Sequence, residues 1–452
     1  MFCSMSNINP ISKLKFLSFK GLSLHTVDKN NMSLLQVSCQ RGTVETVEYL
    51  VNEIGLDVNH NDNYGSTPAL YCSMSNINPI SKLKFLSFKG VSLHTVDNKN
   101  RSLLHASCQM STIETVEYLV NEILLDVNHK DNNGLTPAVL CSTSNINPIS
   151  KLKFLSFKGA SLHAVYNNNM SLLHASCRMG TVETVEYLVN EIGLDANHKD
   201  NNGATPAMYC SNIDPISKLK FLSSKGTSLH SVDNNNKTLL HVSCQWGTVE
   251  TVEYLVNDIG LDVSHKDIEG ICCCVTNLDP VKKINFLSSK GASLINMNLL
   301  GISCLGGTIE TVEYLVNEIG LDVNQSYDND IPLLCCFNSK IQKLEKTSFL
   351  ISNGAMIIIC RPYKDFFRDE DDSGKCSYPL HHSCYLGTLD TVKVLVNDAG
   401  YDVNYTGDDK MTALLWCFKT WIQQQEKIRL LIFKGAVITI CRPYKYFFNN
   451  IL

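Results

Sequence analysis

The sequence has no long apolar run and no strong charge of one sign. Its longest uninterrupted apolar stretch lies around 355–360, far short of the roughly 18 residues that a membrane-spanning helix needs. We therefore expect no membrane insertion. The formal net charge is -5, so the chain has no overall basic field of the kind that attracts nucleic acid. Nucleic acid is not an expected partner.

The sequence also shows no pattern typical of a secretory signal or of a closed disulfide framework. Residues 1–6 have neither a basic segment nor an apolar core. The nineteen cysteines are an odd number, which does not suit complete pairing. Reduced thiols in an intracellular, cytoplasmic protein are the simpler interpretation.

Internal repetition is what the sequence has in abundance. The stretch 4–72 recurs with few changes at 73–141 and 142–210. Later copies diverge, but 307–317 and 387–397 keep the same helix-like segment. Prolines mark one point in successive copies, at Pro10, Pro79, Pro148, Pro215 and Pro280. Such a period predicts a solenoid in which each unit contacts only its neighbours.

Each unit divides into two half-units of about thirty-four residues, and each half-unit predicts a helix pair with a polar turn. In the first half-unit, Val44, Val47 and Leu50 recur at helical spacing. In the second, Asn78-Pro79 predicts an N-cap with proline at the first helical position. Lys89-Gly90 predicts the end of that helix, with glycine just beyond it.

These half-units resemble the ankyrin repeat. That family's consensus carries Thr-Pro-Leu-His at its first helix and Asp-Val-Asn in its outgoing loop. Here Thr67-Pro68 and Leu104-His105 supply the two parts of the first motif, and Asp57-Val58-Asn59 supplies the second. No half-unit among the near-identical copies has all of Thr-Pro-Leu-His. The resemblance covers nearly the whole chain and implies an all-α solenoid of stacked helix-turn-helix units with protruding polar turns.

We expect one continuous array over 1–452. Its approximate double-repeat units are 1–72, 73–141, 142–210, 211–274, 275–336 and 337–417, with 418–452 as a C-terminal repeat end. An acidic insertion lies at 368–376. A shortened turn near 291–301, where Gly301 replaces the expected histidine, predicts a weak seam. Because Met1-Phe2-Cys3 aligns with 70–72, the array begins inside an inner helix, and we expect upstream residues to be missing.

Metal-binding and catalytic patterns are weak. The recurring cysteines, among them Cys39, Cys108 and Cys72, stand where small apolar residues pack helix against helix. Cys272-Cys273-Cys274 lacks the paired spacing of a zinc site. The insertion resembles an EF-hand loop only in part, because Leu380 stands where calcium needs a glutamate. We expect no metal and no cofactor.

The recurring histidines at 105, 174, 241 and 381 have no nucleophile beside them in a fixed pattern. The family resemblance implies that they hydrogen-bond backbone groups of neighbouring loops. We therefore expect no catalytic residues and no enzyme activity. The second-type outer helices carry Lys82, Lys84 and Lys89, whereas the first type carries Glu45 and Glu48. This pattern predicts surface charge that alternates from helix to helix.

The copies differ from one another mainly at the end of the inner helix and in the turn. In ankyrin repeats these regions line the groove and the fingertips, so we expect a scaffold or adaptor that binds a protein partner there. The candidate binding residues are Gln40, Arg41, Arg101, Gln109, Met110, Arg178, Met179, Lys237, Gln245, Trp246 and Tyr385. Trp246 is the expected anchor, because tryptophan often dominates interfaces.

Two alternatives stay open. Neutral drift at exposed positions also produces such variation, and Trp246 also fits a role in covering its own turn. The protein is alternatively an architectural spacer, or the repeat portion of a longer protein whose effector or catalytic domain is missing. The partner's identity and the oligomeric state do not follow from the sequence.

Overall fold

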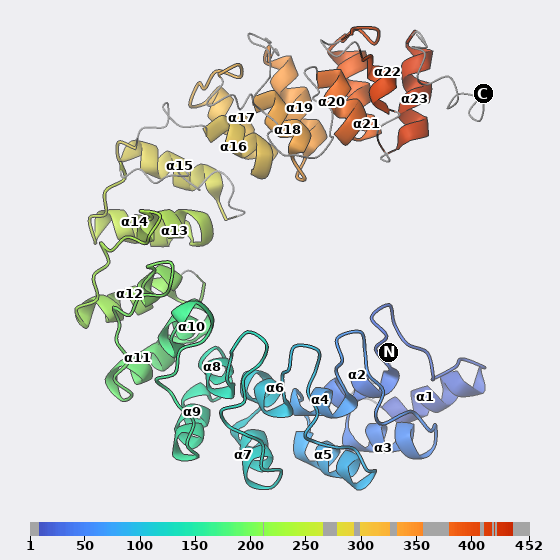
Figure 1. Cartoon of the computed structure of the whole chain (residues 1–452), viewed down its shortest axis with the longest axis vertical. Coiled ribbons are helices and arrows are strands. Elements are labelled where there is room, and N and C mark those ends of the chain that lie inside the picture. Colours follow the sequence, from blue (N-terminus) through green and yellow to red (C-terminus); the bar gives the residue numbers. More distant parts are fainter. Residues whose placement is uncertain are drawn as a thin grey trace. The chain divides into compact units, whose positions relative to one another are not determined.

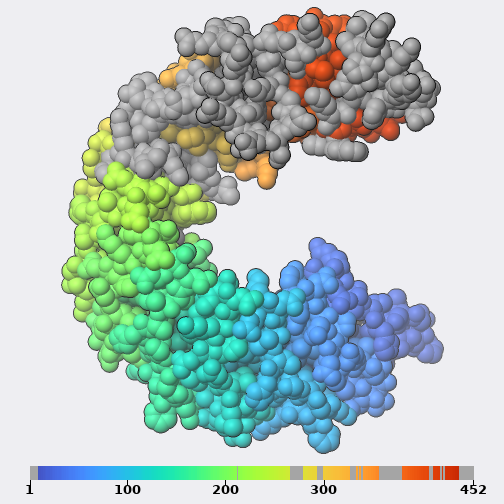
Figure 2. All heavy atoms as spheres, in the orientation of Figure 1, coloured from blue at the N-terminus to red at the C-terminus, as the bar shows by residue number. Residues whose placement is uncertain are grey.

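The computed structural model describes residues 9–210, 212–264, 278–292, 299–325, 332–355, 379–406, 411–417, 420 and 423–436. Its chain divides into two compact units, Met1–Val242 and Ser243–Leu452. Each unit is described by itself. Figure 2 shows the first unit as an unbroken stack, coloured in sequence order from blue to green.

Short helices build the first unit, and they follow one another in pairs (Figure 1). In chain order they are α1 (Pro10–Phe19), α2 (Leu34–Arg41), α3 (Val44–Asn52), α4 (Pro68–Ser73), α5 (Pro79–Phe88), α6 (Leu103–Met110), α7 (Ile113–Asn121), α8 (Pro137–Ser142), α9 (Pro148–Phe157), η2 (Asn167–Asn169), α10 (Leu172–Met179), α11 (Val182–Asn190), η3 (Pro206–Tyr209) and α12 (Pro215–Ser224).

Helix α13 (Leu239–Trp246) crosses the boundary between the units, and the same pairing continues beyond it. The second unit contains α14 (Val249–Asn257), α15 (Pro280–Ser289), α16 (Leu299–Gly306), α17 (Ile309–Asn317), α18 (Pro332–Asn338), α19 (Lys343–Ser352), α20 (Pro379–Leu386), α21 (Leu389–Lys393), the π-helical η5 (Val394–Asp398), α22 (Ala413–Cys417) and α23 (Gln424–Phe433).

Two rows of helices form the stack of the first unit. The inner helices α2, α4, α6, α8 and α10 contact one another in order, and so do the outer helices α3, α5, α7, α9 and α11. Between the rows lie side chains with no exposed surface, such as Leu35 and Leu104 from inner helices and Val47 and Leu83 from outer ones. The predicted all-α stack of helix-turn-helix units is confirmed. In the described ranges, extended pairing is limited to isolated bridges at turns, such as Val27 with Ser33.

Local sequence signals set the helix limits. Thr43 and Thr181 accept hydrogen bonds from backbone N–H groups in the first turns of α3 and α11, as N-caps do. The second-type outer helices begin with proline at the first position, as predicted, and Gly90 follows α5 at φ 86. The predicted N-cap role of Asn78 is wrong in one respect. Its side chain makes no capping bond, and its backbone instead turns into the left-handed region at φ 44.

The turns are tied to one another by side-chain amides and imidazoles. Asn100 Nδ2 donates to the carbonyl of Lys130 at 2.8 Å, and His129 Nε2 lies 3.0 Å from the carbonyl of Asn100. Asn31 with His60 and Asn169 with His198 repeat this pattern. In these three pairs, neighbouring turns therefore satisfy some of each other's backbone carbonyls.

Some predictions fall outside the described residues. The Cys272-Cys273-Cys274 run and the acidic insertion 368–376 lie wholly in undescribed ranges. Of the expected seam at 291–301, only Gly291, Ala292 and 299–301 are described.

Candidate partner-binding surface

The last side chains of the inner helices α2, α6 and α10 in the first unit are partly exposed to solvent. In α6, Cys108 has no exposed surface, whereas Met110 two residues later is 45% exposed. Helix α10 repeats this, with Cys177 buried and Met179 43% exposed. Gln109 and Arg178 are also exposed. Two large apolar side chains thus stand at the same place in consecutive double repeats, each with nearly half of its surface exposed.

The equivalent position in the first copy is polar. There α2 ends with the half-buried Gln40 and the exposed Arg41. This position therefore carries a cation in the first double repeat and a methionine in the next two. Methionine and arginine are both enriched at protein interfaces.

In the second unit, Trp246 ends α13 and is 58% exposed. Gln245 beside it is half-buried. A Cβ at the following Gly247 would lie 2.9 Å from the carbonyl oxygen of Ser243, so the chain leaves the helix in a tight turn with little room for a side chain. At the end of α20, Tyr385 is half-buried and its ring lies 5.6 Å from that of Trp416. That contact gives Tyr385 a packing role within its own unit.

The predicted turn residues are held by their own turns. Arg101 Nε donates to the buried carboxylate of Asp97 at 2.7 Å. The backbone N–H of Lys237 donates to Asp233 at 2.8 Å, and the Lys237 side chain is half-buried. Because the Arg101 guanidinium is already paired with Asp97, it offers little positive charge to a binding partner.

Lysines from the outer helices reach beneath the inner helix ends and cap them. Lys151 Nζ donates to the carbonyls of Cys108 at 2.7 Å and Ser111 at 2.8 Å, and to Ser144 Oγ at 3.1 Å. Cys108 lies in the last turn of α6, where carbonyls have no partner within the helix. The ammonium also meets the negative end of the helix dipole. We call these side chains the lysine caps: Lys82, Lys151, Lys218, Lys283, Lys346 and Lys427, each 0% exposed and each bonded to a cysteine carbonyl.

The prediction that Lys82 and Lys151 contribute surface charge is therefore wrong. In Lys-Leu-Lys the two lysines stand two residues apart and so face different sides of the helix. Lys153, two residues after Lys151, does stay exposed. Burial of Lys151 lowers the pKa of its ammonium, because desolvation disfavours the charged form. A sequence signal was present. Lysine stands at the cap position in every copy from Lys82 onward, whereas the Lys84 position becomes Asn285, Ser348 and Arg429.

The recurring cysteines pack in pairs beside the lysine caps. Cys108 and Cys141, from α6 and α8, are both fully buried. Burial raises the pKa of the Cys108 thiol, and its hydrogen bond with the Cys141 thiol acts in the same direction. Inert, protonated thiols are the expected consequence. Across the described residues, no group of three or more His, Cys, Asp or Glu side chains is arranged to hold a metal ion.

The predicted role of the histidines in bonding neighbouring loops is confirmed for His105, His174 and His381. His105 Nδ1 accepts the backbone N–H of Ser102 at 3.2 Å, so its Nε2 carries the proton and donates to the carbonyl of Leu135 at 3.0 Å. His174 bonds Ser171 and Ala204 in the same way. Burial lowers the pKa of His174 to about 4. These imidazoles are neutral and fully engaged.

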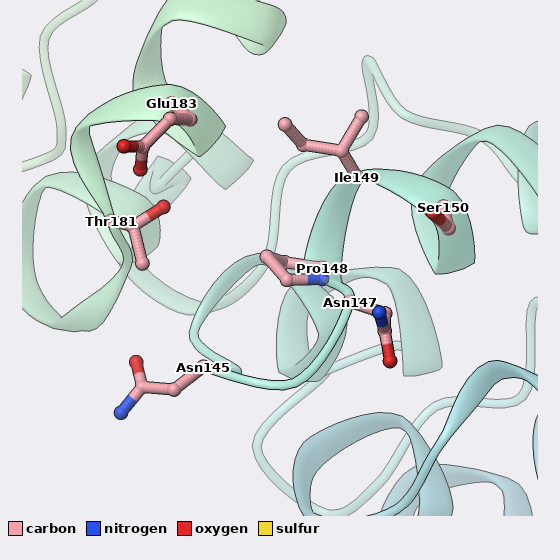
Figure 3. Close-up of a pocket in the computed structure, with 7 residues that line it drawn as sticks. All are labelled: Asn145, Asn147, Pro148, Ile149, Ser150, Thr181 and Glu183. Atoms are coloured by element: carbon pink, nitrogen blue, oxygen red, sulfur yellow. The ribbon is translucent and has the colours of Figure 1, made fainter.

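A small hollow lies between the starts of α9 and α11 (Figure 3). Asn147, Pro148 and Ser150 line one side, and Thr181 and Glu183 line the other. Hydrogen bonds from its own backbone N–H and from Thr181 lower the pKa of Glu183, so a carboxylate already occupies the positive end of α11. No nucleophile and base converge here.

The comparisons with known proteins agree with this architecture. Ankyrin-repeat models match three stretches, residues 1–83, 141–231 and 192–267. The human transient receptor potential cation channel subfamily A member 1 is 23% identical over 86% of this chain and 35% of its own length. An ankyrin repeat domain-containing protein, SAT10, from Stachybotrys chartarum is 23% identical over 61% of this chain and 14% of its own length. Ankyrin repeat protein OPG189 of Variola virus is 23% identical over 52% of this chain and 43% of its own length.

The chain therefore spans less than half of each of these relatives. Within the described ranges, every helix is too short or too polar to span a bilayer. Ankyrin repeats generally serve as protein-interaction modules without catalytic activity. The matched repeat models, the relatives and the stacked helix pairs together show that this chain is an ankyrin-repeat protein.

Proposed function

We propose that the protein is a non-catalytic scaffold that binds a protein partner through the ends of its inner helices and the adjacent turn tips. The observation that carries the proposal is the exposure of Met110 and Met179 at equivalent positions of the first unit. Buried cysteines two residues earlier and the lysine caps beneath hold these helix ends in place. A rigid, prearranged apolar surface loses little entropy when a partner binds.

Trp246 supports the proposal within the second unit. Its ring is more than half exposed, although the same position accommodates a glycine at Gly306 and a leucine at Leu386. Packing within the repeat therefore does not require tryptophan. An exposed tryptophan at a helix end is well placed to fill a pocket on a partner.

The charge distribution supports a protein partner over nucleic acid. The lysine caps remove six ammonium groups from the surface, and the remaining outer-helix charges alternate in sign. Phosphate backbones need clustered, exposed cations. The buried, protonated thiols support an intracellular, reducing location as part of the proposal.

A second candidate is the repeat portion of a longer protein or an architectural spacer. The finding that favours it is coverage, since the chain matches 35% of the human channel and 14% of SAT10. In that case the inner helix ends are free to vary without effect on binding.

The test is affinity capture from native cells, followed by calorimetry on the recovered partner. Trp246→Ala should weaken binding by roughly 2 kcal/mol if the ring is a hot spot, with little change in melting temperature. Trp246→Met is the conservative control, because methionine stands there in two copies. Unchanged affinity for Trp246→Ala and for a Met110→Ser, Met179→Ser double variant would remove the proposed surface and favour the spacer.

A further inference from the structure

A second exposed apolar feature lies at the other side of the stack, at the C-terminal ends of the outer helices. Phe88 ends α5 and Phe157 ends α9, and each is 83% exposed. Between them, Leu124 follows α7 and is 76% exposed. We call these three residues the Phe–Leu strip. Single exposed apolar residues are common, but these three stand at or just beyond the C-terminal ends of three consecutive outer helices.

The contacts of the described residues place the three helices that carry the strip next to one another. Helix α7 contacts both α5 and α9, and the three lie side by side (Figure 1). Lys84 of α5 lies over the Tyr118 ring of α7 at 5.4 Å, which sets these helices in register. The loop after α7 bonds to the end of α9, since Asn128 Nδ2 donates to the carbonyl of Gly159 at 3.0 Å.

Leu124 occupies its place against local conformational preference. Its φ is 61, in the left-handed region, where five other copies have glycine at Gly55, Gly193, Gly260, Gly320 and Gly400. A leucine there is strained because its Cβ crowds the following carbonyl. The side chain gains no compensating burial, since it is mostly exposed. The Leu124 side chain does add an apolar group between Phe88 and Phe157 in the order of the outer helices.

Charges alternate along the same edge. The C-cap residues that directly follow the outer helices α5, α7, α9 and α11 are all exposed: Lys89, Glu122, Lys158 and Glu191. Lys89 and Lys158 lie over the neighbouring Phe88 and Phe157 rings at 5.8 and 5.7 Å. An anionic membrane would meet Glu122 and Glu191 as well as the lysines. The alternation therefore disfavours any surface of uniform charge.

A row of charges that alternate in sign is complementary to a second, antiparallel copy of the same row. A twofold axis between α7 and α9 places Glu122 opposite Lys158 of a second copy, and Lys89 opposite Glu191. The same axis brings Leu124 against Phe157 of the second copy. Such an isologous arrangement uses one patch twice and closes after two subunits.

We propose that the protein self-associates through the Phe–Leu strip, as an antiparallel homodimer with its twofold axis between α7 and α9. The strip is narrow, so the interface belongs to the small, transient class and not to obligate dimers. It leaves the inner helix ends free for another partner.

Sedimentation velocity on the full chain, from about 1 µM to about 1 mM, tests this. Wild type should shift from monomer to dimer with concentration. Phe88→Ser with Phe157→Ser should raise the dimer dissociation constant roughly tenfold or more, which corresponds to losing one good anchor. The fold accommodates serine there, because Ser224 and Ser289 occupy the same position. Phe433→Ser, at an equally exposed phenylalanine in the second unit, is the matched control and should change nothing.

Charge reversal separates this pairing from non-specific association. Glu122→Lys alone should weaken the dimer, and Glu122→Lys with Lys158→Glu should restore it to within about threefold, because the swapped pair still matches across the axis. A monomer at every concentration overturns the proposal. So does a dimer insensitive to both the serine and the charge variants, or a monomer whose strip binds anionic vesicles instead.

Discussion

At the scale of single residues, buried lysine ammonium groups bonded to backbone carbonyls are the least expected feature. A buried ammonium is normally neutralised or paired. Here each lysine cap satisfies backbone carbonyls that the end of an inner helix leaves open, as Lys151 does for Cys108 and Ser111. One flexible side chain thus replaces the polar groups that usually end a helix in water.

We predict that Lys151→Met destabilises the array locally by about 2–4 kcal/mol, because it leaves buried carbonyls without donors. Methionine keeps the aliphatic stem, so lost packing contributes little. Chemical denaturation followed by circular dichroism measures the change. Lys153→Met is the control. That lysine is exposed over the Tyr187 ring at 5.4 Å, and its loss should cost at most about 1 kcal/mol. Equal effects of the two substitutions would contradict the capping role.

The buried histidines predict a dependence of stability on pH. The pKa of His174 falls to about 4 in the folded chain, whereas an unfolded histidine titrates near 6.5. The unfolded state therefore binds more protons between these values. Stability should be complete above about pH 6.5 and fall towards pH 4, by up to about 3 kcal/mol for this residue.

A matched control for this pH dependence exists in the first copy. Gln36 stands where the next three copies have histidine. Its side chain accepts the N–H of Ser33 at 2.7 Å and donates to the carbonyl of Ser66 at 2.6 Å. His105→Gln with His174→Gln should therefore keep the fold and flatten the acid limb of a melting-temperature profile. A profile that stays as steep as in wild type would assign the acid sensitivity to other groups.

At the scale of elements, the turn after α7 differs from its equivalents by one strained residue. Leu124→Gly should stabilise the chain by about 1 kcal/mol through relief of the left-handed backbone. Gly193→Leu, the reverse change one double repeat later, should destabilise it. A Cβ at Gly193 meets nothing within 4 Å, so only the backbone conformation is tested. Urea unfolding of both variants measures the difference. If the homodimer forms as proposed, Leu124→Gly should raise stability while it weakens association.

Much of the element level could be predicted from the sequence, because its signals are local. Pro79 at the first position of α5 and Gly90 beyond its end act on their own backbone, and both predictions are confirmed. The role of His105 followed from the family resemblance. The burial of Lys82 did not follow, because it depends on Cys39, 43 residues earlier. The placement of Trp246 at an exposed helix end agrees with expectation, but its binding role stays a prediction.

At the scale of the whole molecule, stability in a repeat array is a sum of local and neighbour terms. Gly301 is buried in α16 at the place where His105 bonds two backbone groups in α6. Glycine has no side chain for either bond. We therefore keep the prediction of a weak seam near 291–301 within the second unit.

Hydrogen exchange should show faster opening at 299–302 than at 103–106, because residues 299–302 lack the side-chain hydrogen bonds that a histidine makes at this position. Gly301→His tests the cause directly and should slow exchange there. Equal protection of the two segments in wild type would rule the seam out.

The lysine caps also determine where this chain can be divided. Lys82 bonds Cys39, and Lys151 bonds Cys108, so each link joins residues on opposite sides of the boundaries at 72 and 141 that the repeated sequence suggests. A fragment cut at 73–141 contains Lys82 without Cys39, and Cys108 without Lys151. A fragment running from Ser33 to Arg101 retains Cys39 and Lys82 together. The segment that can be expressed by itself is therefore offset from the duplicated sequence by about half a period. Truncation boundaries should be chosen so that each lysine and its cysteine carbonyl stay in the same fragment, and not by the alignment of the copies.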